Sequence, residues 1–368
     1  MIASIPSIPS VITNCAELNQ FVDCVQDAEW IAVDTEFMRD STYYAKLCLV
    51  QIASPDTSAC IDVIKLDDHQ RLIELLQSSQ QIKIFHSARQ DLEVLHSEYD
   101  IIPDSIFDCQ IAASILGLDE QISYAELVAQ ILSVHLAKTE SRTDWSRRPL
   151  TSAQINYALD DVRHLGPLFT HLKDQLEDMQ RMHWLDEECT GLCNKQQYVV
   201  DPEHAWQQVK GVGRLAPEIL PVTQSLAAWR ETTAIEKNLP RRWILSDQSI
   251  LQLAEERPHS EAQVDMLLRK DSPKSVRHSK TIISILEQAY QKSNQLNYVD
   301  RRLNREQQDL VKSMMQVSRK RSQQIGTSSS LLANRKSIVS LVLGLDSKIM
   351  HGWRRKEIGE YLLNMLNP

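Results

Sequence analysis

The apolar and polar positions follow two different patterns along the chain. Up to about residue 195, short apolar runs alternate with stretches of helical period, and the runs predict strands at 30–33, 47–53, 60–64 and 82–85. Strands that alternate with helices are typical of a layered α/β domain. Beyond about residue 214 the strand pattern disappears and helical periodicity continues. The sequence therefore predicts an α/β domain followed by an all-α region.

A stretch with turn-forming residues separates the two regions. Asp201-Pro202 and Gly211-Val212-Gly213 both occur there, which favours a linker. A chain of 368 residues also exceeds what one hydrophobic core usually supports. We expect an α/β domain at 1–195, a linker at 196–213, a helical unit at 214–293 and a second helical unit at 294–368.

Two carboxylates end the first predicted strand. Asp34 and Glu36 follow the apolar run 30–33, and the period of two in a strand projects both side chains from the same face. Two carboxylates on one face of a core strand repel each other unless a cation lies between them. A single Asp-x-Glu at a strand end is more often a solvated strand terminus, so this pair alone does not predict a metal site.

Three further polar residues occur in helical contexts. Asp91 opens an amphipathic helix that follows the apolar run 82–85, and Tyr157 and Asp161 share one face of a predicted helix at 155–165. Each has an ordinary explanation, because an acidic residue in the first turn complements the helix dipole and a Tyr-x3-Asp pair is usually packing beside an exposed carboxylate. Asp160 is adjacent, but the spacing to Tyr157 favours Asp161. The joint occurrence of all these residues favours a functional site.

The order and context of these residues resemble the three exonuclease motifs of the DEDD superfamily, in its tyrosine-containing branch. The flanking sequences are similar to those of the ribonuclease D family within it, at 33–39, 47–53, 107–113 and 138–150. This resemblance implies a ribonuclease H-like mixed sheet in the α/β domain. It also implies a metal-dependent 3′-to-5′ exoribonuclease.

The implied chemistry explains the residue types. Two divalent cations about 3.5–4 Å apart activate a water and stabilise the leaving 3′ oxygen. Mg²⁺, or Mn²⁺ in its place, accepts such oxygen ligands. The resemblance assigns Asp34 to both ions, Glu36 and Asp161 to the ion that carries the attacking water, and Asp91 to the second ion. It assigns Tyr157 to orienting that water and removing its proton.

The resemblance also implies a substrate. It indicates RNA with a free 3′ end, such as transfer RNA precursors, cut to 5′-mononucleotides. Two alternatives stay open: a DNA 3′-to-5′ exonuclease, and a noncatalytic RNA-binding protein on the same fold, against which the intact set of five residues argues. Candidate substrate-binding residues beside the motifs are Thr35, Phe37, His86, Lys138 and Trp145.

Charge is distributed unevenly along the chain. Residues 1–200 contain 14 Lys and Arg against 31 Asp and Glu, whereas residues 201–368 contain 26 against 18. A basic half favours phosphate binding there, although solvated helix faces explain many of these residues. The basic clusters near Pro240 and at 269–280 supply further candidate substrate-binding residues: Arg241, Arg242, Lys274 and Arg277.

The helical region resembles a second known family. The sequences at 226–231, 238–247 and 251–254 are similar to the HRDC domain, a small all-α bundle, and those at 342–344 and 352–359 resemble the end of a second, divergent copy. We expect two HRDC-type bundles that hold RNA without reading its sequence. A purely structural role that shields the catalytic domain is the alternative.

Composition indicates the compartment. The seven cysteines have no paired motif spacing, so we expect reduced thiols and a cytoplasmic protein. Residues 1–9 lack a basic segment before a continuous apolar stretch, which argues against a signal peptide. No apolar run approaches the roughly 20 residues of a membrane span. We expect a monomer with no membrane and no obligate protein partner.

Overall fold

The computed structural model describes residues 9–136, 143–271, 273–292 and 303–366. These residues fall into two compact units. Unit 1 is drawn from Met1–Met38, Lys46–Tyr198 and Leu303–Pro368, and unit 2 from Arg39–Ala45 and Val199–Arg302.

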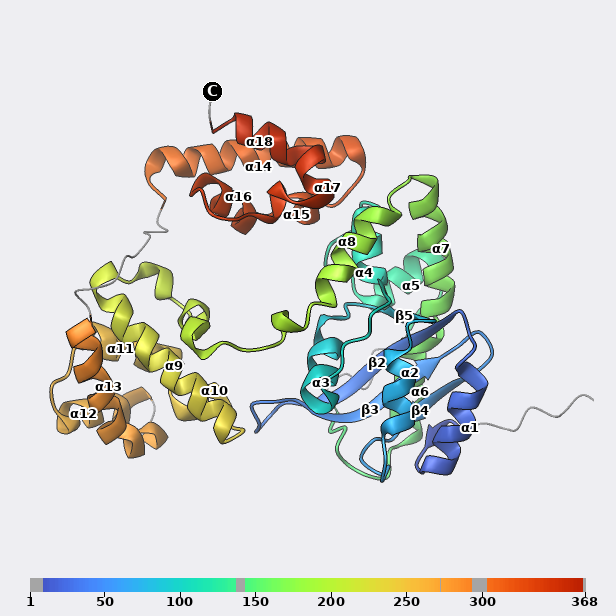
Figure 1. The fold of residues 1–368 in the computed structure, drawn as a ribbon, viewed down its shortest axis with the longest axis horizontal. Helices are drawn as coiled ribbons and strands as arrows, with labels where there is room; N and C mark the ends of the chain where they lie inside the picture. Colours follow the sequence, from blue (N-terminus) through green and yellow to red (C-terminus); the bar gives the residue numbers. More distant parts are fainter. Residues whose placement is uncertain (1–8, 137–142, 272, 293–302, 367–368) are drawn as a thin grey trace, which may run out of the picture. The chain divides into compact units, whose positions relative to one another are not determined.

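A six-stranded sheet forms the centre of unit 1 (Figure 1). Its order is β1-β4-β3-β2-β5-β6, and the strands are β1 Val11–Ile12, β2 Trp30–Met38, β3 Lys46–Ala53, β4 Ser58–Ile61, β5 Ile82–Phe85 and β6 Ile106–Asp108. Strand β2 pairs antiparallel with β3 and parallel with β5, so the expected mixed sheet is confirmed. Strand β4, at Ser58–Ile61, begins and ends earlier than the predicted 60–64, and the side chain of Asp62 just beyond it binds Arg148.

Helices cover this sheet. They are α1 Cys15–Val25, α2 Gln70–Gln77, α3 Arg89–Tyr99, α4 Cys109–Ile115, α5 Tyr124–Leu132, α6 Ser152–Arg163, α7 Leu165–Asp178 and α8 Met182–Leu192. Helix α6 packs across β2, β3 and β4, and α7 packs on β2 and β5. Thr151 and Gln154 form a capping box that starts α6, which fixes where the helix of the third motif begins.

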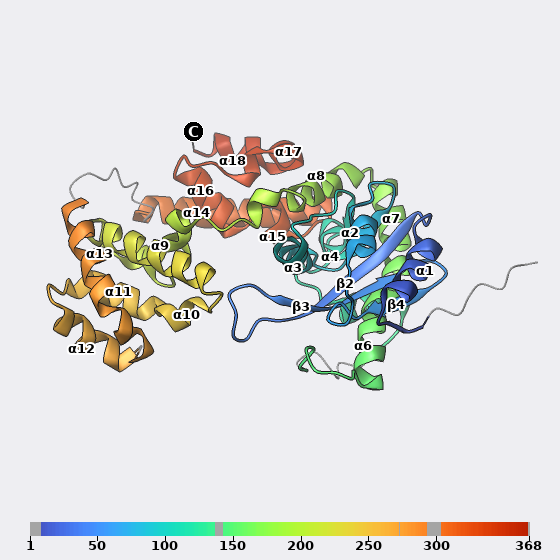
Figure 2. The same ribbon diagram turned by 60° about the horizontal axis from the view of Figure 1, so that its bottom comes forward.

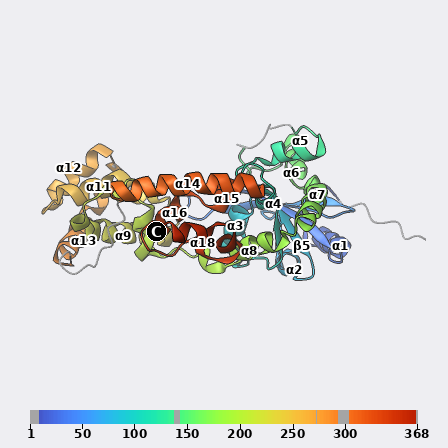
Figure 3. The same ribbon diagram turned by 90° about the horizontal axis from the view of Figure 1, so that it is seen from above.

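The C-terminal helices are part of unit 1. They are α14 Arg305–Ile325, α15 Ser329–Leu332, α16 Arg335–Val342, α17 Gly352–Arg354 and α18 Glu360–Asn364, with a π-helical turn at Arg355–Gly359. Helices α15 and α16 pack against the long helix α14 (Figure 3). Met314 and Leu341 belong to the same hydrophobic cluster as Leu168 of α7. The structure thus differs from the separate unit expected at 294–368.

Specific contacts join the C-terminal helices to the rest of unit 1. The indole of Trp353 stacks on that of Trp184 of α8, with ring centroids 4.1 Å apart and planes 9° apart. Its Nε1 donates a 3.1 Å hydrogen bond to Glu188, which also pairs with Arg354. The guanidinium of Arg181 donates to the carbonyl oxygens of residues 115 and 326. Most of these partners are far apart in the chain, so helical periodicity could not reveal them.

Unit 2 is a helical bundle. Its helices are α9 Leu220–Glu236, α10 Arg241–Ile244, α11 Asp247–Glu256, α12 Glu261–Asp271 and α13 Ser279–Lys292, and α11 and α13 both pack on α9 (Figure 2). The stretch expected to be a linker, 196–213, is folded instead. It contains the 3₁₀ helix Pro202–Gln208, which packs on α9, and buries Ala205 and Val209 in the core of this bundle.

The connection between β2 and β3, residues 39–45, belongs to unit 2. The Tyr43 hydroxyl donates a hydrogen bond to the buried Glu231 carboxylate, and the Tyr43 and Tyr44 backbone amides donate to the Asn238 side chain at 3.0 and 3.1 Å. These contacts attach the connection to α9 and to the residue Asn238 that follows it.

Candidate active site

Three carboxylates meet on one face of the sheet. Asp34 and Glu36 project from β2 as the period of two predicts, and Asp161 reaches them from α6, which packs across that strand. One oxygen from each lies within 4.8 Å of those from the other two. Side chains from two elements thus form a compact group of hard oxygen donors.

The environment of this group disfavours negative charge. Burial, followed by repulsion from the neighbouring carboxylates, raises the pKa of Glu36 to about 9 and that of Asp34 well above its ordinary value. Burial and the adjacent Asp160 raise the pKa of Asp161 to about 7. Oxygen donors that repel one another in a half-buried site suit a hard divalent cation such as Mg²⁺ or Mn²⁺. The residues therefore fit the metal site implied by the sequence.

Asp91 approaches the same strand from α3. Its buried carboxylate accepts a 2.6 Å hydrogen bond from the Thr35 hydroxyl, which lies between the two acidic residues of β2. Burial raises the pKa of Asp91 to about 7, and the Thr35 hydrogen bond opposes this rise because it stabilises the charged form. Thr35 was a candidate substrate-binding residue, but its hydroxyl is buried and bound to Asp91.

Asp108 fixes the start of α3 and was not singled out from the sequence. Its buried carboxylate accepts hydrogen bonds from the backbone amides of Ser87 at 3.2 Å and Ala88 at 2.8 Å. It also caps α4 by accepting from Gln110 N at 2.8 Å. Ser87 has a φ of +66°, so the chain turns sharply between β5 and α3. An Asp directly before a helix is a recognisable N-cap signal, but its second role at α3 is a tertiary one.

Tyr157 lies one helical turn before Asp161. A hydrogen bond joins the Tyr157 hydroxyl to the Asp161 carboxylate, and burial together with this negative charge raises the pKa of Tyr157. The indole of Trp145 lies beside the phenol, with ring centroids 6.2 Å apart. Trp145 is only 2% exposed. The prediction that Trp145 contacts substrate is therefore corrected: it packs in the core, against the ring of Tyr157.

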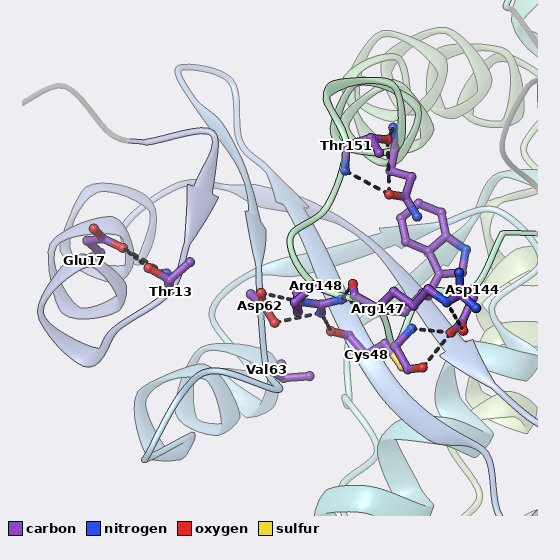
Figure 4. Close-up of polar contacts among 12 residues, drawn as sticks. Thr13, Glu17, Cys48, Asp62, Val63, Asp144, Arg147, Arg148 and Thr151 are labelled. Atoms are coloured by element: carbon purple, nitrogen blue, oxygen red, sulfur yellow. Dashed lines mark hydrogen bonds and ion pairs between the residues drawn. The ribbon is translucent and has the colours of Figure 1, made fainter.

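An ion pair holds the segment that carries Trp145. The Arg148 guanidinium binds the buried Asp62 carboxylate through two hydrogen bonds of 2.6 and 2.7 Å (Figure 4). It also donates to the carbonyl oxygens of Cys48 at 2.9 Å and Trp145 at 2.7 Å. Arg148 thus ties this segment to β3 and to the end of β4, and sets Trp145 beside Tyr157.

The neighbouring Asp160 has partners of its own outside the carboxylate group. Its side chain pairs with Arg163 at 3.1 Å, and its backbone carbonyl accepts a 2.9 Å hydrogen bond from the Tyr124 hydroxyl. The structure thus brings Asp161, and not Asp160, next to Asp34 and Glu36. Tyr124, which sequence reasoning missed, anchors α6 to α5 at this point.

The other candidates beside the motifs have different surroundings. The Nε2 atom of His86 lies 3.0 Å from the carbonyl oxygen of Ile122, and the His86 ring packs edge-on against Tyr124, so this histidine is engaged inside the protein. Phe37 is half-buried on β2, just after a shift in the strand register. Lys138 lies outside the described residues.

The basic candidates in unit 2 divide into two kinds. Arg241 forms a two-pronged ion pair with the buried carboxylate of Glu231, which makes it part of the fold. Arg242, Lys274 and Arg277 are exposed. The Lys274 ammonium lies 6.0 Å from the centre of the Trp243 ring, and this indole is 40% exposed.

Two further sequence expectations concern the whole chain. All seven cysteines are unpaired. Among the residues that the structure describes, the helices are too short or too polar to cross a lipid bilayer.

Comparisons with known proteins show which families the chain resembles. The family model for a 3′-5′ exonuclease matches residues 9–177, and that for the HRDC domain matches residues 220–286. A ribonuclease D of Jannaschia sp. is 34% identical over 98% of this chain and 96% of its own length, and one of Bartonella henselae is 34% identical over 97% and 89%.

A solved structure extends the likeness to three dimensions. The crystal structure of Escherichia coli RNase D, described as an exoribonuclease involved in structured RNA processing, superposes with a TM-score of 0.87. It is 29% identical and covers 97% of this chain and 98% of its own. With its exonuclease fold, its HRDC domain and relatives matched over nearly their whole length, the chain belongs to the ribonuclease D family of 3′-to-5′ exoribonucleases.

Proposed function

We propose that the carboxylate site removes nucleotides from the 3′ end of RNA and releases 5′-mononucleotides. The observation that carries this proposal is the group formed by Asp34, Glu36 and Asp161, whose oxygens lie within 4.8 Å of one another. Such a group is costly to bury unless it binds cations. A nuclease needs it because a phosphodiester repels the hydroxide that attacks it.

The residues have distinct roles in this proposal. Asp34, Glu36, Asp91 and Asp161 hold two divalent cations, Mg²⁺ or Mn²⁺, with Asp34 shared between the ions. When bound, such a pair supplies charge neutralisation for the attacking and leaving oxygens. The Tyr157 hydroxyl, which hydrogen-bonds Asp161, orients the attacking water and helps to remove its proton. Thr35 and Trp145 keep Asp91 and Tyr157 in place.

Unit 2 is proposed to hold the RNA body. Its cations Arg242, Lys274 and Arg277 can contact phosphates, and the exposed indole of Trp243 beside Lys274 offers a stacking surface. An aromatic ring interleaved with cations suits a nucleic acid of any sequence. We propose structured RNAs, in particular transfer RNA precursors, as substrates, in line with the family resemblance.

The C-terminal helices are proposed to be a second, divergent HRDC-type bundle that supports the catalytic unit. The sequence at 352–359 carries the resemblance, and the shared hydrophobic cluster with α7 and α8 supports the structural role. We further propose a cytoplasmic monomer, which accords with seven unpaired cysteines.

Matched RNA and DNA oligomers test this function. Each is prepared with a free 3′ hydroxyl or a blocked 3′ end and is incubated with the full chain, with Mg²⁺ or with EDTA. We expect shortening of the free RNA from its 3′ end in Mg²⁺ only, with 5′-mononucleotides identified by chromatography. Asp34→Asn is the matched control, because it keeps the shape of the side chain but removes its charge. Cleavage in EDTA, full activity of Asp34→Asn, or preference for DNA would each contradict the proposal.

A further inference from the structure

Gln51 is a buried amide without a hydrogen-bond partner. It lies on β3 with 0% of its surface exposed, and neither its Oε1 nor its Nε2 has a partner among the described residues. A buried polar group left unsatisfied costs about 1–3 kcal/mol. An apolar side chain of similar size would avoid that cost, so the amide needs a partner in some state of the site.

The register of the sheet places Gln51 next to Asp34. Gln51 lies directly opposite Asp34 of β2 and, on its other side, opposite Cys60 of β4. Residues paired in this way share a face of the sheet, with Cβ atoms about 4.5–5.5 Å apart.

Helix α6 covers that face. The Cys60 thiol lies 4.0 Å from the Ile155 carbonyl oxygen of α6, and the same helix supplies Asp161 to the carboxylate group. Gln51 therefore lies beside Asp34 in the layer beneath α6, where water has no access.

We infer that Gln51 is a positioning residue whose Nε2 donates a hydrogen bond to the Asp34 carboxylate when that group binds a divalent cation. The inference rests on the metal site proposed above. A carboxylate that binds a cation keeps further lone pairs that can accept a hydrogen bond from the amide. Hydrogen bonds of this kind orient metal ligands, and their loss typically weakens metal affinity about 10–100-fold.

The variant Gln51→Met tests the inference, since it keeps the side-chain length but removes the amide. Three measurements are made. Calorimetry without RNA gives the affinity for Mn²⁺, cleavage of a short RNA in Mg²⁺ gives kcat and KM, and thermal unfolding is recorded in EDTA. We expect Mn²⁺ affinity to fall at least about tenfold and kcat to fall with KM unchanged. In EDTA the variant should unfold at the same temperature as the wild type or higher, because the unsatisfied amide is gone. Opposite effects on metal binding and stability separate positioning from general damage to the fold.

Gln81→Met is the matched control. Gln81 is also buried, and it directly precedes β5. Its Nε2 donates to the carbonyl oxygens of Val25 at 2.6 Å and Ala28 at 3.0 Å. Its replacement should lower the unfolding temperature and leave Mn²⁺ affinity unchanged.

Unchanged Mn²⁺ affinity and kcat in Gln51→Met would overturn the inference while leaving the proposed function intact. A wild-type chain that binds no Mn²⁺ would instead overturn the metal site and the inference with it.

A measurement on the wild type covers the case in which Gln51→Met does not fold. In protein labelled with ¹⁵N-glutamine, the Gln51 side-chain amide signal, assigned with Gln51→Asn, should shift when Mg²⁺ is added. A signal that stays in place at saturating Mg²⁺ would equally overturn it.

Discussion

The hydroxyl of Thr35 donates a 2.6 Å hydrogen bond to the carboxylate of Asp91, 56 residues further along the chain. Thr35 lies between Asp34 and Glu36, so a single strand residue connects the first acidic motif to the second. Its side chain points to the opposite face of the sheet from its two neighbours, because successive residues alternate along a strand. The motif Asp-Thr-Glu therefore supplies two carboxylates to the site and, through the Thr35 hydroxyl, a hydrogen bond to a third.

Thr35→Val should lower activity without unfolding the protein. Valine keeps the shape of threonine but removes the donor, so Asp91 loses the group that orients it. We expect Mn²⁺ affinity and kcat to fall about tenfold or more, measured by calorimetry and by single-turnover cleavage of a short RNA. Thr35→Ser retains the hydroxyl and should stay close to the wild type. Equal activity of the valine and serine variants would contradict this role.

Arg148→Gln should destabilise the catalytic unit strongly. Breaking a buried ion pair leaves its partner charge uncompensated, here the Asp62 carboxylate, and typically costs about 3–5 kcal/mol. Urea unfolding with the free energy extrapolated to water measures this change. Arg147→Gln is the matched control, because Arg147 is 84% exposed and pairs with Asp144 on the surface. If both variants unfold at the same urea concentration, Arg148 does not hold its segment in place.

Local patterns were sufficient to predict the carboxylate positions. The strand period of two places Asp34 and Glu36 on one face, and the helical period places Tyr157 and Asp161 on another. Both periods depend on backbone geometry alone. The start of α6 was predicted less well: the helix begins at Ser152, three residues before the expected 155, because Thr151 and Gln154 form a capping box there.

Contacts between distant residues could not be predicted in this way. Trp145 stands among Asp144, Ser146 and Arg147, a polar setting typical of an exposed loop. Arg148 nevertheless binds Asp62, 86 residues earlier and just beyond β4, and so holds the segment on the sheet. The stretch 196–213 was expected to be a linker because of its Pro and Gly residues. Its two buried side chains, Ala205 and Val209, are too few to produce a clear period. In each case tertiary packing decided the structure.

Trp353→Ala should destabilise the exonuclease unit, although the residue belongs to the C-terminal helices. Trp353 is 3% exposed and stacks on Trp184, and truncating a buried tryptophan typically costs about 3–5 kcal/mol. Thermal unfolding and cleavage of a short single-stranded RNA at elevated temperature should both show the loss. Tyr361→Ala, at a position 61% exposed, is the control and should change little. A Trp353→Ala variant as stable as this control would mean that the C-terminal helices do not support the fold.

Metal should stabilise the protein more as the pH rises. Burial raises the pKa of Asp91 and Asp161 to about 7 and that of Glu36 to about 9, so the folded state binds these protons more tightly than the unfolded chain does. Their stabilising effect is complete below the unfolded pKa values near 4 and is lost as the pH rises through about 7 towards about 9. A bound cation compensates the charges that then form.

Unfolding temperatures in Mg²⁺ and in EDTA, recorded between about pH 5 and about pH 8, measure this effect. We expect the difference between the two conditions to increase with pH. The double variant Asp34→Asn with Asp161→Asn should abolish the difference, since two of the repelling charges are absent. A difference that is constant across this range would contradict the linkage between protonation and metal binding.

Charge reversal on unit 2 should lower the affinity for structured RNA more than it lowers the rate of cleavage. Each phosphate that an arginine no longer neutralises should reduce the slope of log affinity against log salt by about 0.9 on a duplex or about 0.7 on a single strand. We expect Arg242→Glu with Arg277→Glu to flatten this slope for a hairpin RNA with a 3′ extension, measured by fluorescence anisotropy in EDTA. Cleavage of a short single strand at saturation should be nearly unchanged. Arg241 is not a suitable target, because its reversal would leave the buried Glu231 carboxylate unpaired. The control Arg242→Lys with Arg277→Lys keeps both charges and should retain the wild-type slope. Equal slopes in all three proteins would mean that these arginines are ordinary solvated surface residues and do not bind RNA.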